Sequence, residues 1–271
     1  MNVVLAPAGV KLARVLSPYD DLLHYPDRAR PAVPRYVNIG AGAFFHPYWH
    51  NLDVPNAYYR NAQGDHVHIV FDLAGTDPLP FGDGSLSLAY CSHVVEHLPS
   101  SAVEHLFREV RRCLATGGLF RVTCPDMDLE YRAYMRGDAA FWRWKNAYGV
   151  FPDTLEQKLL DHFATILTRA HPETGAPKVT DAEVARVFRQ EPKAAAFEHF
   201  IKLIPWDLAR AYPADHVNWF DADRLMEMLR CAGFGHVYDS RFGQSRAPQL
   251  RNTRLFDTTC PELSVYVEAE A

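Results

Sequence analysis

Short apolar runs, each closed by a glycine, an acid or a turn, recur through the first half of the chain. They predict five strands, at 36–39, 52–54, 68–71, 86–91 and 119–124. Between the last two, apolar residues over 101–114 recur at helical spacing, and Thr116-Gly117-Gly118 is a sequence suited to ending a helix. Strands that alternate with helices predict a largely parallel sheet covered on both faces.

The pattern changes after Asp126. From 127 to 215 the chain becomes helical and rich in aromatic residues, which predicts an insertion that roofs a pocket. Four aromatic residues of this stretch have the spacing of a helix core: Phe141, Trp142, Trp144 and Tyr148. Asp221 is placed to N-cap an amphipathic helix over 221–231, and strands are expected at 236–238 and 263–268.

These elements predict an α/β chain in four parts. They are a leader at 1–34, a sheet core at 35–126, the helical insertion or lid at 127–215, and the completion of the core sheet at 216–271.

Composition and charge remove several classes of protein. With 48% apolar and 23% charged residues, the 271-residue chain has ordinary globular composition. A formal net charge of -5 argues against nucleic acid as a partner, because such proteins usually carry a basic face. Five cysteines without a CxxC pair predict free thiols, and no run of about 18 apolar residues is long enough to span a bilayer. We therefore expect a cytoplasmic protein that does not contact a membrane.

Candidate binding residues follow the ends of the predicted strands. Gly40-Ala41-Gly42 follows the first strand, where glycine allows close backbone approach to a ligand. Asp53 ends the second strand and is suited to accept hydrogen bonds from both hydroxyls of a ribose. Asp72 and Leu73 follow the third strand, where the Asp72 carboxylate and the Leu73 amide can bind an exocyclic amine and a ring nitrogen. Together these positions predict a nucleoside pocket.

Five segments occur in the order typical of one enzyme family: Asn38-Ile39-Gly40-Ala41-Gly42, Asn51-Leu52-Asp53, Asp72 with Leu79-Pro80-Phe81, Ser92-His93-Val94-Val95-Glu96-His97-Leu98, and Leu114-Ala115-Thr116-Gly117-Gly118. Over residues 36–126 the chain resembles the class I S-adenosylmethionine (SAM)-dependent methyltransferases. It is most similar to short bacterial members associated with polysaccharide and natural-product pathways. The segment 225–234 and the last strand are similar too.

The resemblance implies a Rossmann-like, mostly parallel sheet of seven strands with the last strand antiparallel. It implies SAM as the cofactor, with Gly40, Ala41 and Gly42 under its methionine part. It further implies Asp53 at the ribose, Asp72 and Leu73 at the adenine, and Ser92 and His93 beside the sulfonium. Two positions differ from the family pattern. Asn38 stands in place of the usual acid but can still hydrogen-bond, so it remains a predicted cofactor-binding residue, and Phe44 stands in place of the usual third glycine.

The predicted reaction is methyl transfer, most simply to a hydroxyl of a small-molecule or saccharide acceptor. Such an acceptor benefits from a base near its hydroxyl, and histidine is well tuned for this at neutral pH. The candidate catalytic residues are His216, which similar enzymes often place near the mouth of the site, and also Asp126 and His97.

Two other functions compete with this interpretation. His93-Val94-Val95-Glu96-His97 matches the HxxEH pattern of inverted zinc peptidases, which would make the protein a metal-dependent hydrolase. The pattern begins directly after a strand and Pro99 soon follows, so the long helix of such a site is not expected, and we expect no metal there. A non-catalytic SAM-binding module is the third possibility.

Overall fold

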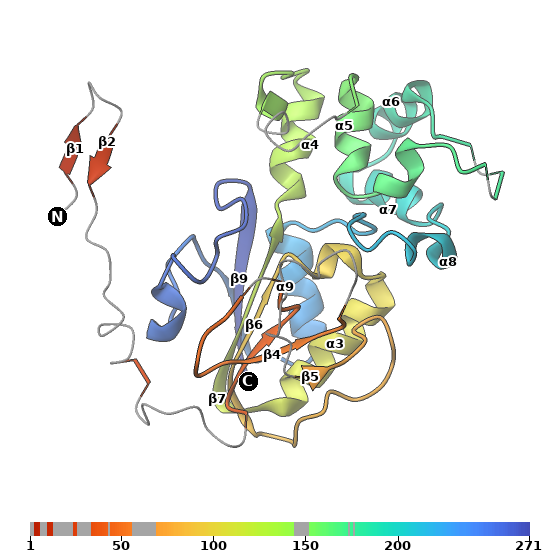
Figure 1. The fold of residues 1–271 in the computed structure, drawn as a ribbon. Coiled ribbons are helices and arrows are strands. Elements are labelled where there is room, and N and C mark those ends of the chain that lie inside the picture. Colours follow the sequence, from red (N-terminus) through yellow and green to blue (C-terminus); the bar gives the residue numbers. More distant parts are fainter. Residues whose placement is uncertain are drawn as a thin grey trace.

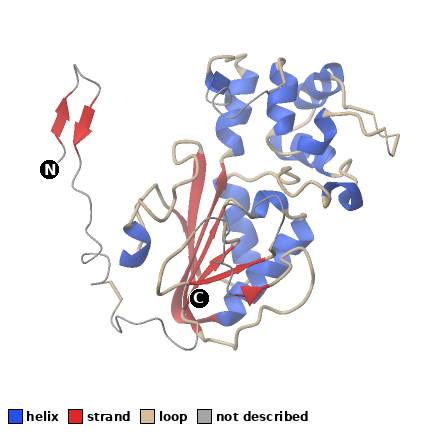
Figure 2. Ribbon diagram, in the orientation of Figure 1, coloured by secondary structure: helices blue, strands red, loops and turns tan. Residues whose placement is uncertain are grey.

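The computed structural model describes residues 3–5, 10–12, 24–25, 34–42, 44–55, 69–143, 152–172, 174–175 and 177–271. A seven-stranded sheet forms the centre of the described structure (Figures 1 and 2). Its strands are β3 (Tyr36–Ile39), β4 (His50–Asp53), β5 (Ile69–Val70), β6 (Leu86–Ser92), β7 (Leu114–Pro125), β8 (His236–Asp239) and β9 (Ser264–Glu270). Near the amino terminus, β1 (Val3–Leu5) and β2 (Val10–Leu12) pair antiparallel in a separate two-stranded sheet.

The order of strands in the main sheet is β5-β4-β3-β6-β7-β9-β8. Pairs among β5, β4, β3, β6 and β7 are parallel, whereas β9 runs antiparallel to both β7 and β8. The chain enters the main sheet near its middle, at β3, and continues outward through β4 to β5. It then returns to β6 on the other side of β3, so the direction of strand order reverses between β3 and β6. In such sheets ligands bind outside the carboxyl ends of the strands at this reversal. The predicted Rossmann-like fold, with its last strand antiparallel, is confirmed.

Helices pack on the sheet and beyond its carboxyl end (Figure 1). The helical elements are η2 (Val95–His97), α3 (Ser100–Cys113), α4 (Met127–Met135), α5 (Leu155–Asp161), η4 (Thr165–Thr168), α6 (Asp181–Gln190), α7 (Lys193–Ile201), α8 (Trp206–Ala209), α9 (Ala222–Cys231) and η5 (Pro248–Arg251). Apolar residues of α3 and α9 join one face of the sheet in a buried cluster, and the other face carries aromatic residues under η5.

Successive side chains of β7 point to opposite faces of the sheet, so this one strand contributes to the packing on both faces. Phe120, Val122 and Cys124 point into the cluster shared with α3 and α9. Arg121, between them, points to the opposite face and pairs there with Asp257 at 2.6 Å. Because successive strand residues face opposite sides, a buried cation can sit beside a fully apolar core.

The end of α3 differs from the sequence prediction. The helix stops at Cys113, and Leu114 is already extended and pairs with Leu86 of β6. Thr116-Gly117-Gly118 therefore lies within the start of β7, because strand pairing, absent from the local sequence, extends past it. The predicted N-cap at Asp221 is confirmed. Asp221 caps α9, and its Oδ1 accepts a hydrogen bond from the Arg224 amide at 2.9 Å.

The helices α4 to α8 form a second buried cluster of their own, in which Trp142 is 1% exposed. Phe141 packs edge-on against Trp142 and lies partly buried against this cluster. Trp144 and Tyr148 of the same predicted aromatic group lie outside the described residues. Within the described part of the chain, no helix is both long enough and apolar enough to cross a membrane.

Candidate active site

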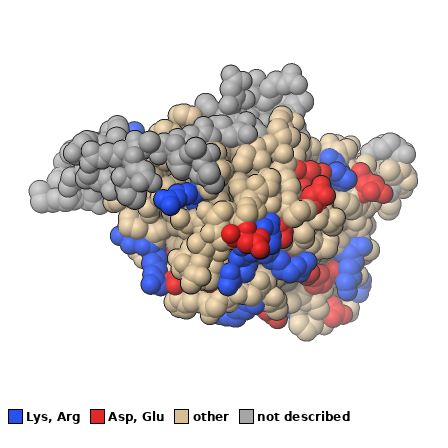
Figure 3. All heavy atoms as spheres, turned by 90° about the horizontal axis from the view of Figure 1, so that it is seen from below, with Lys and Arg blue, Asp and Glu red and all other residues tan. Residues whose placement is uncertain are grey.

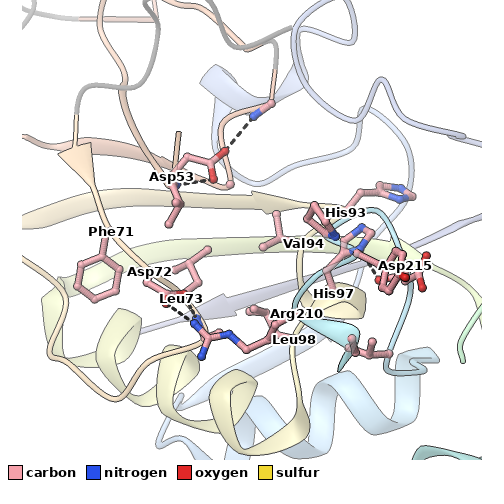
Figure 4. Close-up of a pocket in the computed structure, with 18 of the residues that line it drawn as sticks. Asp53, Phe71, Asp72, Leu73, His93, Val94, His97, Leu98, Arg210 and Asp215 are labelled. Atoms are coloured by element: carbon pink, nitrogen blue, oxygen red, sulfur yellow. Dashed lines mark hydrogen bonds and ion pairs between the residues drawn. The ribbon is translucent and has the colours of Figure 1, made fainter. Parts of the chain in front are cut away.

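A cavity of about 440 Å³ lies at the carboxyl ends of β3, β4 and β6 (Figure 4). Sheet residues form one wall, among them Gly40, Asp53 and Ser92, and the segment 206–217 at the end of the insertion forms another. Its volume is in the range of small-molecule sites. The strand reversal and the insertion therefore enclose one pocket.

The glycine loop after β3 approaches its neighbours closely. Gly40 has φ +75°, and a Cβ atom there would lie 2.1 Å from Val94 Cγ2, so only glycine fits. The amides of Ala41 and Gly42 donate to Asp53 Oδ2 at 2.8 and 3.3 Å. The loop is thus held against the end of β4, with Gly40 and Gly42 on the cavity wall.

Asp53, the predicted ribose-binding residue, lies at the end of β4 beside the cavity. Its Oδ1 accepts from the Val54 amide at 2.7 Å, and the side chain lies at the cavity wall (Figure 4). A carboxylate offers about four acceptor positions. The same side chain can therefore hold the glycine loop and also bind a ligand hydroxyl.

Asp72 and Leu73 line the same cavity, as the sequence predicts for an adenine site. Asp72 Oδ1 accepts from the Ala74 amide at 2.9 Å, and its Oδ2 lies 3.2 Å from Arg210 Nη2 of the insertion. Both charged side chains are about half exposed. The insertion therefore touches the sheet domain beside the predicted adenine position.

Sequence reasoning missed Val54 and Phe71 as part of this site. Both line the cavity, each directly beside a predicted binding acid, and Val54 is 39% exposed despite being apolar. An apolar wall suits the face of a flat ring. The available signal was their position: each is an apolar residue adjoining an acid at the end of a strand.

Asn38 is not among the residues that line this cavity. Its side chain is buried between β3 and β4, where its Nδ2 lies 3.4 Å from Asn51 Oδ1. Asn51 in turn donates to the Phe44 carbonyl at 2.6 Å. The two positions that differ from the family pattern, Asn38 and Phe44, are thus linked through Asn51 and shape the loop beneath the site.

His93 and His97 follow β6 at the other end of the cavity. His93 has φ +53°, unusual for a residue with a side chain, and its Nε2 lies 2.9 Å from Ser264 Oγ. His97 lines the cavity, and its Nδ1 donates to the Asp215 carbonyl at 3.0 Å. The element that joins them, η2, has three residues. The long helix of an inverted zinc peptidase is therefore absent from this described segment.

Glu96 lies behind these histidines and is 1% exposed. Its Oε1 lies 3.1 Å from His93 Nδ1. Burial acts to raise the pKa of Glu96, but the His93 hydrogen bond and the nearby imidazoles of His97 and His216 outweigh it and lower the pKa to about 2. The site therefore contains a buried carboxylate that is ionised at neutral pH.

His216 is brought to this cluster from the end of the insertion. Its ring centroid lies 4.8 Å from that of His97 and 5.0 Å from that of His162. Its Nδ1 donates to the His162 carbonyl at 2.8 Å. Burial lowers the pKa of His216 well below its usual range, and His97 and His162 lower it further. The ring lies behind His97 and is not among the cavity-lining residues.

Asp126, the third candidate base, lies elsewhere. It caps α4, where its Oδ1 accepts from the Asp128 amide at 3.0 Å, and it lines a separate cavity with Ser264 and Tyr266. Burial raises its pKa, and the charges of Asp128 and Asp221 raise it further. The structure thus brings His97 and His216 together but leaves Asp126 apart from them.

Six cavity residues from the insertion were also missed: Trp206, Ala209, Arg210, Tyr212, Pro213 and Asp215. Only Asp215, which directly precedes the predicted His216, had a neighbouring signal in the sequence.

The surface seen in Figure 3 carries both signs of charge interspersed, with no continuous basic stripe among its described residues.

Comparison with known proteins gives one family match, to the model of a methyltransferase domain over residues 50–122. No curated protein sequence matches this chain. A SAM-dependent methyltransferase from Mesorhizobium loti is 16% identical, with 89% of this chain and 93% of that one covered at a TM-score of 0.40. A SAM-dependent methyltransferase from Thermotoga maritima is 14% identical, with 87% and 81% covered at a TM-score of 0.39.

PigF, whose structure contains S-adenosylhomocysteine (SAH), is 13% identical with a TM-score of 0.40. Its match covers 88% of this chain and 50% of PigF, so this chain spans about half of PigF's length. All three likenesses are distant, and the fold assignment rests on the strand order of the sheet itself.

Proposed function

We propose that this chain is a class I SAM-dependent methyltransferase that methylates a hydroxyl of a small-molecule or glycan acceptor. The strand order of its sheet and the family match over residues 50–122 support the methyltransferase part of this proposal. One observation carries the proposal: a single cavity is lined by the predicted cofactor residues other than Asn38 and Ala41 and, at its other end, by the His97 imidazole. SAM supplies a methyl group on a sulfonium, whose sulfur–methyl bond breaks as the acceptor oxygen takes the methyl carbon.

The residues present fit SAM. Gly40 leaves no room for a side chain and so keeps the loop backbone open to the methionine part. Asp53 would accept hydrogen bonds from the ribose, and Asp72 and the Leu73 amide would bind the adenine. Ser92 and His93 would flank the sulfonium at the end of β6.

In this proposal the acceptor hydroxyl lies at the His97 end of the cavity. His97 Nδ1 is occupied by the Asp215 carbonyl, so Nε2 is the ring nitrogen that can take the hydroxyl proton. His216, favoured as the base on sequence, would act through its ring contact with His97. Catalysis would come mainly from holding the acceptor oxygen in line with the methyl group.

Asp53→Ala tests the cofactor site. We expect isothermal titration calorimetry to give micromolar SAH binding for the wild type. The variant should bind about 10 to 100 times more weakly, because hydrogen bonds to a charged group contribute about 1.5–3 kcal/mol. Asp83→Ala is the matched control: this acid is 81% exposed and outside the cavity, so SAH binding should not change. Equal SAH affinity in all three proteins would refute the proposed site.

A panel of acceptors tests the reaction itself. Purified protein, SAM and small alcohols, phenols or saccharides should give a methylated product in mass spectrometry, with SAH formed in equal amount. Loss of product formation in His97→Gln, with SAH binding retained, would support the proposed acceptor end of the cavity. SAH binding without turnover on any acceptor of the panel would favour a non-catalytic SAM-binding module.

A further inference from the structure

Two histidines and one glutamate meet where the sheet domain contacts the insertion. Glu96 and His97 belong to η2, and His216 comes from the segment before α9, 119 positions beyond His97. Each can offer one ligand atom, and these atoms all lie within 4.8 Å of one another. The His97–His216 ring contact holds the two segments together at this point.

The hydrogen bonds of the two histidines determine which nitrogen is available. His97 Nδ1 contacts the Asp215 carbonyl, and His216 Nδ1 contacts the His162 carbonyl. A carbonyl oxygen only accepts, so each Nδ1 carries the hydrogen, and each neutral ring keeps a lone pair on Nε2. An Nδ1–H bonded to a backbone carbonyl is the arrangement that orients histidines as metal ligands.

The buried carboxylate of Glu96 is short of hydrogen-bond donors among the described residues. His93 Nδ1 lies 3.1 Å from its Oε1, but neither Oε1 nor Oε2 meets the geometry of a hydrogen bond with any described residue. A buried carboxylate oxygen without a partner is costly. Two imidazoles and a carboxylate thus lie close together, each able to offer one ligand atom, and a cation bound by Glu96 and the two Nε2 atoms would satisfy all three.

We infer that Glu96, His97 and His216 bind one divalent transition-metal ion. Two imidazoles and one carboxylate form a ligand set of zinc enzymes and of non-haem iron enzymes. This set differs from the HxxEH motif in the sequence, because His93 is replaced as a ligand by His216. His93 instead positions Glu96, with its other ring nitrogen at Ser264.

The ion would deepen the proposed function, on which this consequence rests. Three protein ligands leave a coordination position for a substrate oxygen, and His97 lines the cavity. A bound cation lowers the pKa of a hydroxyl that coordinates it. In the metal-bound protein the acceptor would lose its proton to water, in place of the transfer to His97 Nε2 proposed for the metal-free site, and would gain the methyl group as the sulfur–methyl bond breaks.

Metal binding can be measured without any activity assay. Full-length protein, free of a polyhistidine tag and treated with a chelator, would be titrated with Zn²⁺ by calorimetry and with Co²⁺ by visible absorption. We expect one ion per chain. His216→Gln should bind Zn²⁺ at least 100 times more weakly and lose the Co²⁺ spectrum. Glu96→Gln is a second ligand variant, and circular dichroism checks that each variant is folded.

Two further histidine variants make the test specific. His236→Ala removes a side chain that is 64% exposed on β8, so Zn²⁺ affinity should match the wild type. His93→Ala should keep the Co²⁺ spectrum and weaken Zn²⁺ binding about tenfold, as expected when a residue that orients a ligand is lost.

The inference is overturned if wild-type protein binds Zn²⁺ no better than folded His216→Gln. Loss of the Co²⁺ spectrum in His93→Ala but not in His216→Gln would overturn it in favour of the motif read from the sequence. SAH titrations run in parallel separate the two proposals. SAH binding without metal binding would overturn the metal site alone, whereas metal binding without SAH binding would contradict the proposed function and leave the metal site supported.

Discussion

At the residue scale, Gly40 is a position of the cavity wall where an added side chain would clash with its neighbour. Gly40→Ala should lower the free energy of unfolding by about 2–4 kcal/mol, as the sum of a left-handed backbone and an overpacked contact with Val94. SAH binding should also weaken, because the loop must shift to relieve the clash. Urea denaturation and SAH calorimetry measure the two effects.

Gly42 provides the matched control for that substitution. It too has positive φ (+49°), but a Cβ atom there would meet nothing within 4 Å. Gly42→Ala should therefore cost only the backbone part, about 1–2 kcal/mol. In a double-mutant cycle, Val94→Ala should recover part of the Gly40→Ala loss. Equal costs for the two glycine variants, with no coupling to Val94, would contradict the clash as the cause.

At the element scale, α3 is tied to the loop before β6 by two of its own side chains. Arg112 Nη2 pairs with Glu109 Oε2 at 2.6 Å, and the Leu79 amide donates to the same oxygen at 2.8 Å. These bonds, that of Arg112 first, lower the pKa of Glu109 below its ordinary value of 4.5. The helix is thereby fixed against the loop that carries Leu79 into the core.

This lowered pKa has a definite consequence for the pH dependence of stability. The unfolded chain protonates Glu109 more readily than the folded one, so its contribution is complete above about pH 4.5 and is lost as the pH falls through the folded pKa. Glu109→Gln should cost about 1 kcal/mol at pH 7 and progressively less below pH 4.5. Urea denaturation between pH 3 and 7 measures it.

Glu104, exposed on the same helix, is the control for charge alone. Glu104→Gln should change the free energy of unfolding by less than about 0.5 kcal/mol at neutral pH. If Glu109→Gln costs as much at pH 3 as at pH 7, ionisation of Glu109 is not what links α3 to the loop.

At the scale of the whole molecule, one lysine joins the insertion to the sheet domain. Lys193, at the start of α7, lies 2.7 Å from Asp128 of α4 and 2.7 Å from Asp221, which caps α9. Lys193→Met leaves the two carboxylates without their shared cation. It should lower the free energy of unfolding by about 1–3 kcal/mol in urea denaturation.

Lys202→Met, at the exposed carboxyl end of α7, removes a charge from the same helix without breaking such a link. Its effect should stay within about 0.5 kcal/mol. A similar small effect for Lys193→Met would show that the packing of the two buried clusters, and not this ion triad, holds the insertion in place.

The sequence by itself determined most strands of the sheet and most of the predicted cofactor residues that line the cavity. Periodicity is a local property, so β3 has the predicted bounds and Asp221 caps α9 as expected. Gly40, Asp53 and Asp72 were identifiable because each follows a strand, and parallel strands bring their carboxyl ends to one edge. The order of the strands in the sheet could be predicted only from the resemblance of these motifs to the class I methyltransferases.

Only the tertiary structure decided which side chains gather around His97 at the other end of the cavity. His216 meets His97 because the insertion folds back on the sheet, and no local pattern encodes that contact. Pairing with β6 likewise carried Thr116-Gly117-Gly118 into a strand. The same long-range packing placed Asp126 at a different cavity and gave Glu96, not His93, the buried position between two imidazoles.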